Sequence, residues 1–258
     1  MTGPFRRVAV WCWYRGAGFH GYQHQHALRT VQGELLRAFA AVGLERNPVV
    51  AGRTDKGVSA RMQVLSFRLA RGRELELTMT LLNDALPHDV RLHRGREVGP
   101  SFHAAWSATA KEYRFTLDRS HAGDLSRLRD VAALVPGTRN FQVFHFKTSE
   151  VKPRTVTSVD VQAGSNDVTL RFVGDGFARH MVRMLTGGMT AVARGEVDID
   201  TFRAGLDAQR NFHCPTAPAD GLTLWSVDYA PQVDPFLPAE RAAFAWPQPE
   251  EAAAASLP

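Results

Sequence analysis

Residues 49–69 read Val-Val-Ala-Gly-Arg-Thr-Asp-Lys-Gly-Val-Ser-Ala-Arg-Met-Gln-Val-Leu-Ser-Phe-Arg-Leu, with two apolar segments on either side of a charged loop. Val49 to Ala51 predicts a short strand, and the alternation from Met62 to Leu69 predicts a second one. Gly52 and Gly57 bracket the charged residues, and glycine permits tight turns and close backbone approach. The stretch therefore predicts a strand–loop–strand unit that presents Asp55 at a strand end.

Asp55 has a cation on each side, Arg53 and Lys56. Neighbouring positive charge favours the ionised form of a carboxylate. An ionised aspartate can act as a nucleophile or as a base at neutral pH. A second interpretation is structural: a tight turn in which Asp55 caps the backbone while Arg53 is solvated. From the residues alone both interpretations stay open.

The rest of the chain alternates strands and helices in two halves of similar order. Arg7 to Tyr14 is apolar on both faces, which is typical of a central strand. Thr30 predicts the N-cap of a helix that ends at Gly43. Further elements are expected at 78–85 (helix), 90–92 and 97–98 (strands), 109–117 (strand), 125–134 (helix), 155–163 and 167–173 (hairpin), 177–194 and 199–209 (helices) and 222–229 (strand). Residues 141–146 are aromatic-rich and fit no single type.

This order predicts an α+β fold of two related domains, 1–103 and 104–230, whose largely antiparallel sheets join and are flanked by helices. The N-terminal domain would carry the Asp55 loop. Residues 231–258 are rich in Ala, Pro and Glu and predict a loosely ordered tail.

The predicted helix 177–194 holds an arginine opposite its apolar side. Phe177, Met181 and Leu185 belong to that apolar side, and Arg183 falls nearly opposite its centre. Gly187, one turn further on, predicts a hollow in which the guanidinium could lie. The arginine is then either reserved for a carboxylate or phosphate in a cleft, or part of an ordinary solvated basic face.

Tyr113 lies in the strand at 109–117. A tyrosine in a strand belongs to the core, or it stacks on a base if it opens onto a cleft.

The composition of the chain limits the classes of function that we expect. The net charge is +5, from 27 arginines and four lysines against 26 acidic residues. Arginine suits nucleic acid, because its planar fork bridges phosphate oxygens and stacks on bases, although a GC-rich genome produces the same bias. The two cysteines and scattered histidines lack metal-ligand spacing, and Arg179 interrupts the only candidate dinucleotide fingerprint. We expect no cofactor and no metal, and the absence of a signal-peptide pattern or long apolar run predicts a cytoplasmic protein away from membranes.

Taken together, several motifs resemble those of one family, tRNA pseudouridine synthase A, over Val8 to Tyr229. The most specific is Gly52-Arg53-Thr54-Asp55-Lys56-Gly57-Val58, which is similar to the family's catalytic loop. The other matches follow in the family's order: Gly18-Phe19-His20-Gly21-Tyr22-Gln23, Leu82-Asn83-Asp84-Ala85-Leu86-Pro87, Phe102-His103-Ala104, Lys111-Glu112-Tyr113-Arg114-Phe115, His180-Met181-Val182-Arg183 and Ala217-Pro218-Ala219-Asp220-Gly221-Leu222.

The resemblance implies roles for four residues. Asp55 matches the catalytic aspartate, Arg183 the arginine that pairs with it, Tyr113 the tyrosine that stacks on the target base, and Arg53 an arginine that helps to expose the nucleotide. It also implies a cofactor-free homodimer with a basic cleft. The implied substrates are uridines 38, 39 and 40 in the anticodon stem-loop of tRNA.

Two positions depart from the family pattern. Ser59 stands where bacterial members usually have histidine, and Ala178 replaces a usual leucine. Ser59 adjoins the catalytic loop, so the departure concerns local packing or tRNA contact rather than the proposed chemistry.

The implied reaction is an isomerisation in which the target nucleotide leaves the stack. One alternative is a tRNA-binding protein or chaperone that lacks catalysis, against which the complete set of four residues argues. The other is an unrelated basic α+β protein, which would fail to bind folded tRNA at low salt.

Overall fold

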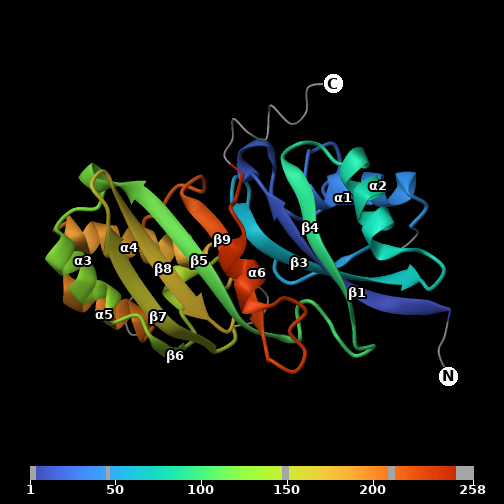
Figure 1. The fold of residues 1–258 in the computed structure, drawn as a ribbon. Helices are drawn as coiled ribbons and strands as arrows, with labels where there is room; N and C mark the ends of the chain where they lie inside the picture. Colours follow the sequence, from blue (N-terminus) through green and yellow to red (C-terminus); the bar gives the residue numbers. More distant parts are fainter. Residues whose placement is uncertain (1–3, 45–46, 147–150, 209–212, 248–258) are drawn as a thin grey trace. The chain divides into compact units, whose positions relative to one another are not determined.

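The computed structural model describes residues 4–44, 47–146, 151–208 and 213–247 (Figure 1). The chain divides into two compact units, Met1–Thr109 with Ser226–Pro258, and Ala110–Trp225. The sequence placed the boundary at 103/104, whereas the structure places it inside strand β5 (Ala108–Asp118) and again inside β9 (Leu222–Tyr229). The C-terminal segment thereby returns to the first unit.

The sheet of the first unit follows the hydrogen-bonded order β4-β1-β3-β9, and β2 also pairs with β3. Its strands are β1 (Phe5–Tyr14), β2 (Val49–Val50), β3 (Ser59–Ala70) and β4 (Val90–Val98). The pairs β1–β3, β1–β4 and β2–β3 are all antiparallel. β1 is central and buried from Val8 to Tyr14, as its apolar sequence predicted.

Two helices, α1 (Val31–Ala41) and α2 (Leu75–Ala85), cover one face of this sheet. The Thr30 side chain accepts a hydrogen bond from the backbone N–H of Gly33, which confirms it as the N-cap of α1. Phe39 of α1 packs edge-on against Phe67 of β3, with ring centroids 5.0 Å apart. These contacts hold β3, and with it the end of the Asp55 loop, against the core.

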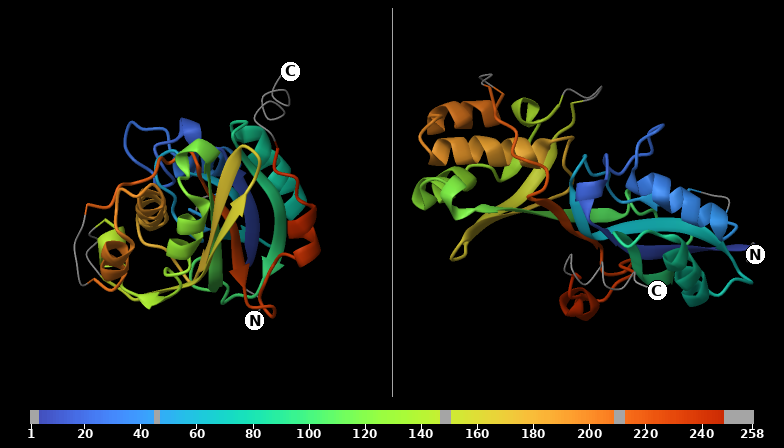
Figure 2. Two further views of the ribbon diagram at one scale, coloured as in Figure 1. Left: turned by 90° about the vertical axis from the view of Figure 1, so that its left-hand side faces the viewer. Right: turned by 90° about the horizontal axis from the view of Figure 1, so that it is seen from above.

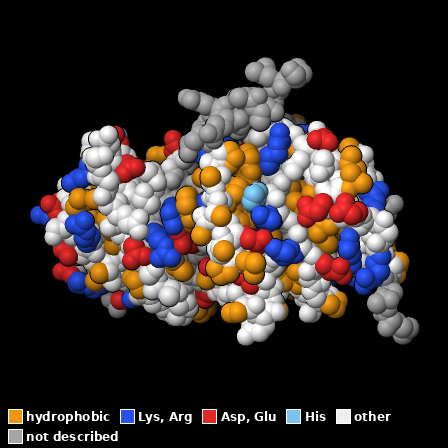
Figure 3. Space-filling model, viewed as in Figure 1, with side chains coloured by type: hydrophobic (Ala, Val, Ile, Leu, Met, Phe, Trp, Pro, Cys, Tyr) orange, Lys and Arg blue, Asp and Glu red, His pale blue; other side chains and the backbone are white. Residues whose placement is uncertain are grey.

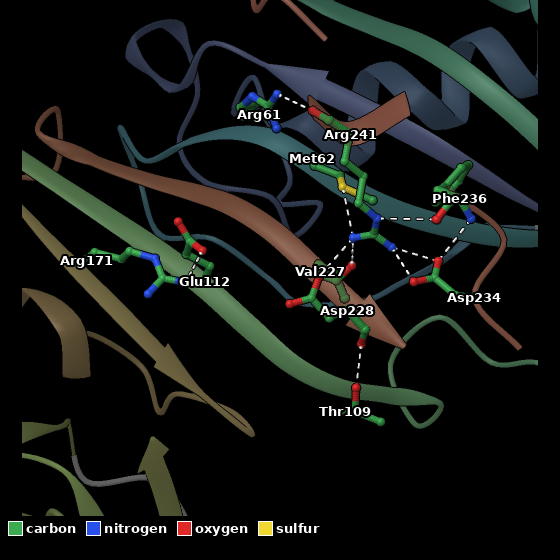
Figure 4. Close-up of polar contacts among 10 residues, drawn as sticks. All are labelled: Arg61, Met62, Thr109, Glu112, Arg171, Val227, Asp228, Asp234, Phe236 and Arg241. Carbon is green, nitrogen blue, oxygen red and sulfur yellow. Dashed lines mark hydrogen bonds and ion pairs between the residues drawn. The ribbon is translucent and has the colours of Figure 1, made fainter. Parts of the chain in front are cut away.

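The C-terminal segment packs on the other face of the same sheet. Trp11 of β1 contacts the rings of Phe236 and Phe244. Arg241, in helix α6 (Pro238–Ala243), donates from Nη1 to Asp228 and from Nη2 to both carboxylate oxygens of Asp234 (Figure 4). The composition of the tail predicted loose attachment from residue 231, but residues 231–247 carry these contacts because an arginine and two aromatic rings anchor them. Residues 248–258 lie outside the described part.

The second unit follows the order β9-β5-β8-β7-β6, with antiparallel pairs β5–β8, β7–β8 and β6–β7. Strands β6 (Gly137–Arg139), β7 (Arg154–Ala163) and β8 (Asp167–Gly174) accompany β5. Helices α3 (Leu125–Ala132), α4 (Met181–Ala193) and α5 (Ile199–Leu206) lie along this sheet (Figure 2). The predicted hairpin at 155–173 is confirmed.

Several boundaries differ from the expected ones. The helix expected from Phe177 begins at Met181, because His180 has a left-handed backbone (φ 64°) that a helix cannot continue through. β4 is continuous where two short strands were expected. β6 and the 3₁₀ turns Gly16–Gly18, Arg119–His121 and Gln142–Phe144 had no sequence signal strong enough to predict them. The end of the predicted helix 199–209 lies outside the described residues.

The expected fold class is confirmed, with antiparallel strands, α+β composition and helices flanking the sheets. β5 and β9 contribute residues to both units.

Candidate active site

The Asp55 loop, residues 51–58, connects β2 to β3, as the sequence predicted. Asp55 is half-buried, Arg53 and Lys56 are exposed, and Thr54 between them is buried. The Thr54 side chain therefore points inward, whereas Arg53 and Lys56 face the solvent.

A buried polar network supports the loop from below. The Tyr14 hydroxyl lies 2.8 Å from the Thr54 hydroxyl. The amide of Gln63, a fully buried residue, donates to the carbonyl of Gly52 at 2.6 Å and accepts from its N–H at 3.2 Å. It also donates to the Tyr14 hydroxyl at 3.3 Å. A satisfied buried network of this kind rigidifies the backbone that it contacts.

The segment Gly18–Gln23, which we call the brace, also makes hydrogen bonds to this loop. The N–H of Tyr22 donates to Thr54 O at 3.0 Å, and the N–H of Gly57 donates to Phe19 O at 3.2 Å. These two bonds hold the backbone before and after Asp55. Sequence reasoning matched this segment to the family but gave it no role.

Gly21 makes this close contact possible. Its φ is 96°, and a Cβ at this position would lie 3.1 Å from Thr54 O and 3.2 Å from Lys56 N. A side chain at this position would strain the backbone and would crowd the Asp55 loop. Gly21 was the one feature of this segment of the sequence that indicated a close backbone contact.

Arg53 extends from the loop to the same brace, where its guanidinium donates to the Gln23 side chain at 3.0 Å. The brace is itself tied to the unit through Arg29, whose guanidinium makes two 2.8 Å bonds to Asp89. These bonds raise the pKa of Arg29. Arg53 therefore projects from a supported loop, which argues against the freely solvated arginine of the turn interpretation.

The unusual serine at position 59 has a local partner. Its hydroxyl accepts a hydrogen bond from the N–H of Gly16 at 2.9 Å. A Cβ on Gly16 would lie 2.3 Å from the backbone of Val58, so Gly16 is in direct contact with the end of the Asp55 loop. Ser59 thus fits a tight junction beside the Asp55 loop.

Tyr113 belongs to the second unit, on β5 opposite Phe172 of β8. It is 8% exposed, and Phe177 packs edge-on against it with ring centroids 5.2 Å apart. Phe177 precedes α4, so the segment that enters this helix orients the tyrosine ring.

Arg183 also belongs to the second unit, in the first turn of α4. Its Nε donates to Ala217 O at 2.8 Å, and the N–H of Ala217 donates to Arg183 O at 3.1 Å. The prediction of a hollow over Gly187 is wrong. A Cβ at Gly187 would lie 2.0 Å from the carbonyl oxygen of Pro215, so backbone fills the space. The segment 215–217 orients the arginine instead.

The arrangement of possible metal ligands and the burial of the cysteines can be described for part of the chain. Those residues contain no cluster of three or more His, Cys, Asp or Glu side chains suited to a metal ion. Cys12 and Cys214 are buried, and burial raises the pKa of both thiols, that of Cys214 to about 12. Over the same residues, no helix has the length and apolar character needed to cross a bilayer.

The site residues predicted from the sequence thus fall into two pairs. Arg53 and Asp55 are supported by β1, β3 and the brace of the first unit. Tyr113 and Arg183 are oriented by Phe177 and by the 215–217 segment of the second unit.

Comparison with known proteins gives a consistent result. A family model described as tRNA pseudouridine synthase matches residues 131–230. The tRNA pseudouridine synthase A of Chloroflexus aurantiacus is 35% identical over 250 residues, covering 88% of this chain and 90% of the relative. That of Bacillus pumilus is 35% identical over 237 residues, covering 84% and 96%.

Among solved structures, a Cbf5-Nop10-Gar1 complex aligns over 71% of this chain and 44% of the matched chain, with a TM-score of 0.38 and 13% identity. That likeness is too weak to carry an argument, whereas the relatives match nearly end to end. The chain therefore belongs to the tRNA pseudouridine synthase A family and is an isomerase that converts uridine in tRNA to pseudouridine.

Proposed function

We propose that Asp55 is the catalytic carboxylate and that the modified uridines lie in the anticodon stem-loop, at positions 38, 39 and 40. The observation that carries the assignment of Asp55 is the double support of its loop, whereas the tRNA positions follow from the resemblance to tRNA pseudouridine synthase A. Gln63 holds Gly52 from below, and Phe19 and Tyr22 hold the backbone on both sides of Asp55. A reacting group needs this kind of fixed backbone to meet its target within a fraction of an ångström.

The reaction is an isomerisation, so it needs no external group donor. The bond from the ribose C1′ to N1 of uracil breaks, the base turns, and C5 bonds to C1′. The hydrogen of C5 leaves as a proton, and N1 gains one. Asp55 serves as nucleophile towards the sugar or the ring, or as the base that removes the C5 proton.

Arg183 is proposed to pair with Asp55 and to keep it ionised. Its Nε is engaged by Ala217, which aims the terminal nitrogens of the guanidinium. An arginine held in this way can meet a carboxylate with two parallel bonds. The pairing favours the charged carboxylate at neutral pH.

Tyr113 is proposed to stack on the flipped uracil, and Arg53 to assist exposure of the nucleotide. Extruding a base costs a few kcal/mol of stacking and pairing, which contacts to an aromatic ring and to phosphates offset. Arg53 lies on the exposed side of the loop, with Gln23 holding its guanidinium. A homodimer and a cytoplasmic location complete the proposal.

The position specificity can be tested with tRNA transcripts in which uridine is kept at only one of positions 38, 39 and 40. Pseudouridine formation at these sites, and none in a transcript lacking all three, is the expected result. Modification that persists in that last transcript would place the target elsewhere in the tRNA. Binding of tRNA with no modification of any transcript would favour a non-catalytic tRNA-binding protein.

A further inference from the structure

One loop of the first unit, residues 99–107, displays a tryptophan to solvent from a rigid frame. Trp106 is 86% exposed, the most exposed of the large apolar side chains among the described residues. Its indole lies flat on the imidazole of His103, with centroids 4.0 Å apart and planes 8° apart. One face of the indole is therefore taken by the imidazole.

Hydrogen bonds fix this stacked pair in place. Nδ1 of His103 accepts from the N–H groups of Ala105 and Trp106 at 3.2 and 3.1 Å. The N–H of Ala104 donates to the Ser66 hydroxyl at 3.2 Å, and the Tyr229 hydroxyl donates to Ala104 O at 2.8 Å. The exposure of Trp106 is thus built into an ordered loop, since the loop's own backbone holds its stacking partner and the sheet holds Ala104.

Two arginines beside the loop have no acidic partner among the residues that the structure describes. Arg7 of β1 and Arg68 of β3 are directly opposite each other in the antiparallel register. Like charges in such a pair destabilise a sheet. In the described part of the chain neither side chain has a hydrogen bond or ion pair, whereas neighbouring Arg6 donates to Glu97.

These features share one face of the sheet. Side chains alternate along a strand, so Phe5, Arg7, Ser66 and Arg68 point to the same side. Ser66 anchors the loop on that side, and the Arg7 charge acts on His103. Phe5 is itself 50% exposed. We call this set, Phe5, Arg7, Arg68, His103 and Trp106, the basic–aromatic patch.

Basic and acidic side chains are mixed on one face of the molecule (Figure 3). On the face drawn in Figure 3, basic side chains alternate with acidic ones rather than forming one field of a single sign. Several other arginines are neutralised in ion pairs, such as Arg171 with Glu112 and Asp160. Unneutralised guanidinium groups beside an open indole are therefore a distinguishing feature of the patch.

We propose that the basic–aromatic patch is a second RNA-contacting surface, which takes a base or terminal base pair on Trp106 and the flanking phosphates on Arg7 and Arg68. Stacking on an aromatic ring and pairing of guanidinium with phosphate are the two contacts that RNA offers irrespective of sequence. The two arginines repel each other in the free protein, and a polyanion relieves that repulsion. A second copy of this chain would instead bring more of the same charge to the patch.

The inference rests on tRNA being the substrate, and kinetics on full-length tRNA test it. Trp106→Ala is expected to raise KM about fivefold or more, since loss of one base stack has that effect or a larger one, with kcat unchanged. Trp106→Phe should recover part of the affinity. Arg68→Gln should lower the slope of log K against log salt by about one.

Leu77→Ala is the matched control, since Leu77 is an exposed apolar residue (58%) outside the patch, and its KM should stay at the wild-type value. An unchanged KM for Trp106→Ala, with wild-type activity intact, would overturn the inference. A change in oligomeric state on sedimentation of Trp106→Ala would also overturn it, by assigning the patch to contact between copies. Failure of the proposed function would appear separately, as wild-type protein that binds tRNA without forming pseudouridine or as an Asp55→Asn variant that keeps its activity.

Discussion

Arg183 and Ala217 exchange two hydrogen bonds: Nε of the arginine donates to the alanine carbonyl at 2.8 Å, and the alanine N–H donates to the arginine carbonyl at 3.1 Å. The guanidinium of the second unit is thus oriented by a backbone segment 34 residues further along the chain. That segment can approach α4 only because residue 187 is glycine, whose missing Cβ makes room for Pro215.

Gly187→Ala should therefore displace the 215–217 segment and with it Arg183. We expect kcat to fall by about 10- to 100-fold, since a shift of about 1 Å at a reacting centre has effects of this size. Single-turnover kinetics with saturating enzyme measure the chemical step. Gly176→Ala is the control, because a Cβ at Gly176 meets no atom within 4 Å. A normal rate for Gly187→Ala would show that Ala217 does not position Arg183 for the reaction.

Gln63 is predicted to hold the Asp55 loop. Gln63→Met keeps the volume but leaves the buried N–H and carbonyl of Gly52 without their partner, which costs roughly 1–3 kcal/mol for each such group. Chemical denaturation measures the loss of stability, and kcat should fall with it. The same change at exposed Gln162 should leave both values near wild type. Equal stability of the two variants would remove Gln63 from the support of the loop.

Arg241 anchors the C-terminal segment in the first unit. Its guanidinium contacts Asp228, Asp234, the Val227 carbonyl and the Met62 sulfur (Figure 4). Arg241→Ala should lower the free energy of unfolding by about 2–3 kcal/mol, as expected for hydrogen bonds to a charged group, and should change the fluorescence of Trp11.

Arg203→Ala provides the comparison for this variant, because Arg203 makes an exposed ion pair with Asp200 and should contribute less than about 1 kcal/mol. If the two variants lost the same stability, the C-terminal segment would not be anchored by Arg241.

The imidazole of His103 makes the loop that carries Trp106 sensitive to pH. Burial, and secondly the charge of Arg7, lower the pKa of His103. The folded state then favours the neutral ring, so the unfolded chain binds the proton more readily. This contribution to stability is complete above the ordinary histidine pKa of about 6.5 and is lost as pH falls through the lower folded value.

His103→Phe keeps an aromatic ring under Trp106 and removes the titration. The difference in Tm between wild type and this variant should therefore shrink as pH falls from about 7.5 to about 5. A difference that stays constant over this range would mean that His103 titrates alike in the folded and unfolded chain.

Local patterns were sufficient to predict most of the strands, the Thr30 cap and the Asp55 loop, because apolar periodicity and glycines mark them within a few residues. Contacts between distant segments left weaker signals. The brace from Phe19 and Tyr22 depends on Gly21, which alone does not reveal what approaches it. The late start of α4 follows from the left-handed backbone of His180, a conformation that histidine adopts only where its surroundings impose it.

The same limit explains the Gly187 error. Periodicity placed Arg183 and Gly187 on one side of a helix, but it carried no information about Pro215, which fills that side. The return of residues 226–247 to the first unit was likewise not predicted, since the Ala, Pro and Glu content of the tail conceals the anchoring residues Phe236, Arg241 and Phe244.

The most direct measurement is tritium release from tRNA carrying 5-tritiated uridine, with wild type and Asp55→Asn compared at equal tRNA occupancy. Pseudouridine formation expels the hydrogen of C5, so the assay follows the proposed reaction itself. Asparagine keeps the size of the side chain and removes its negative charge. We predict release by the wild type and none above background by Asp55→Asn, with tRNA binding retained. Release at the wild-type rate by Asp55→Asn would contradict the assignment of Asp55 as the catalytic carboxylate.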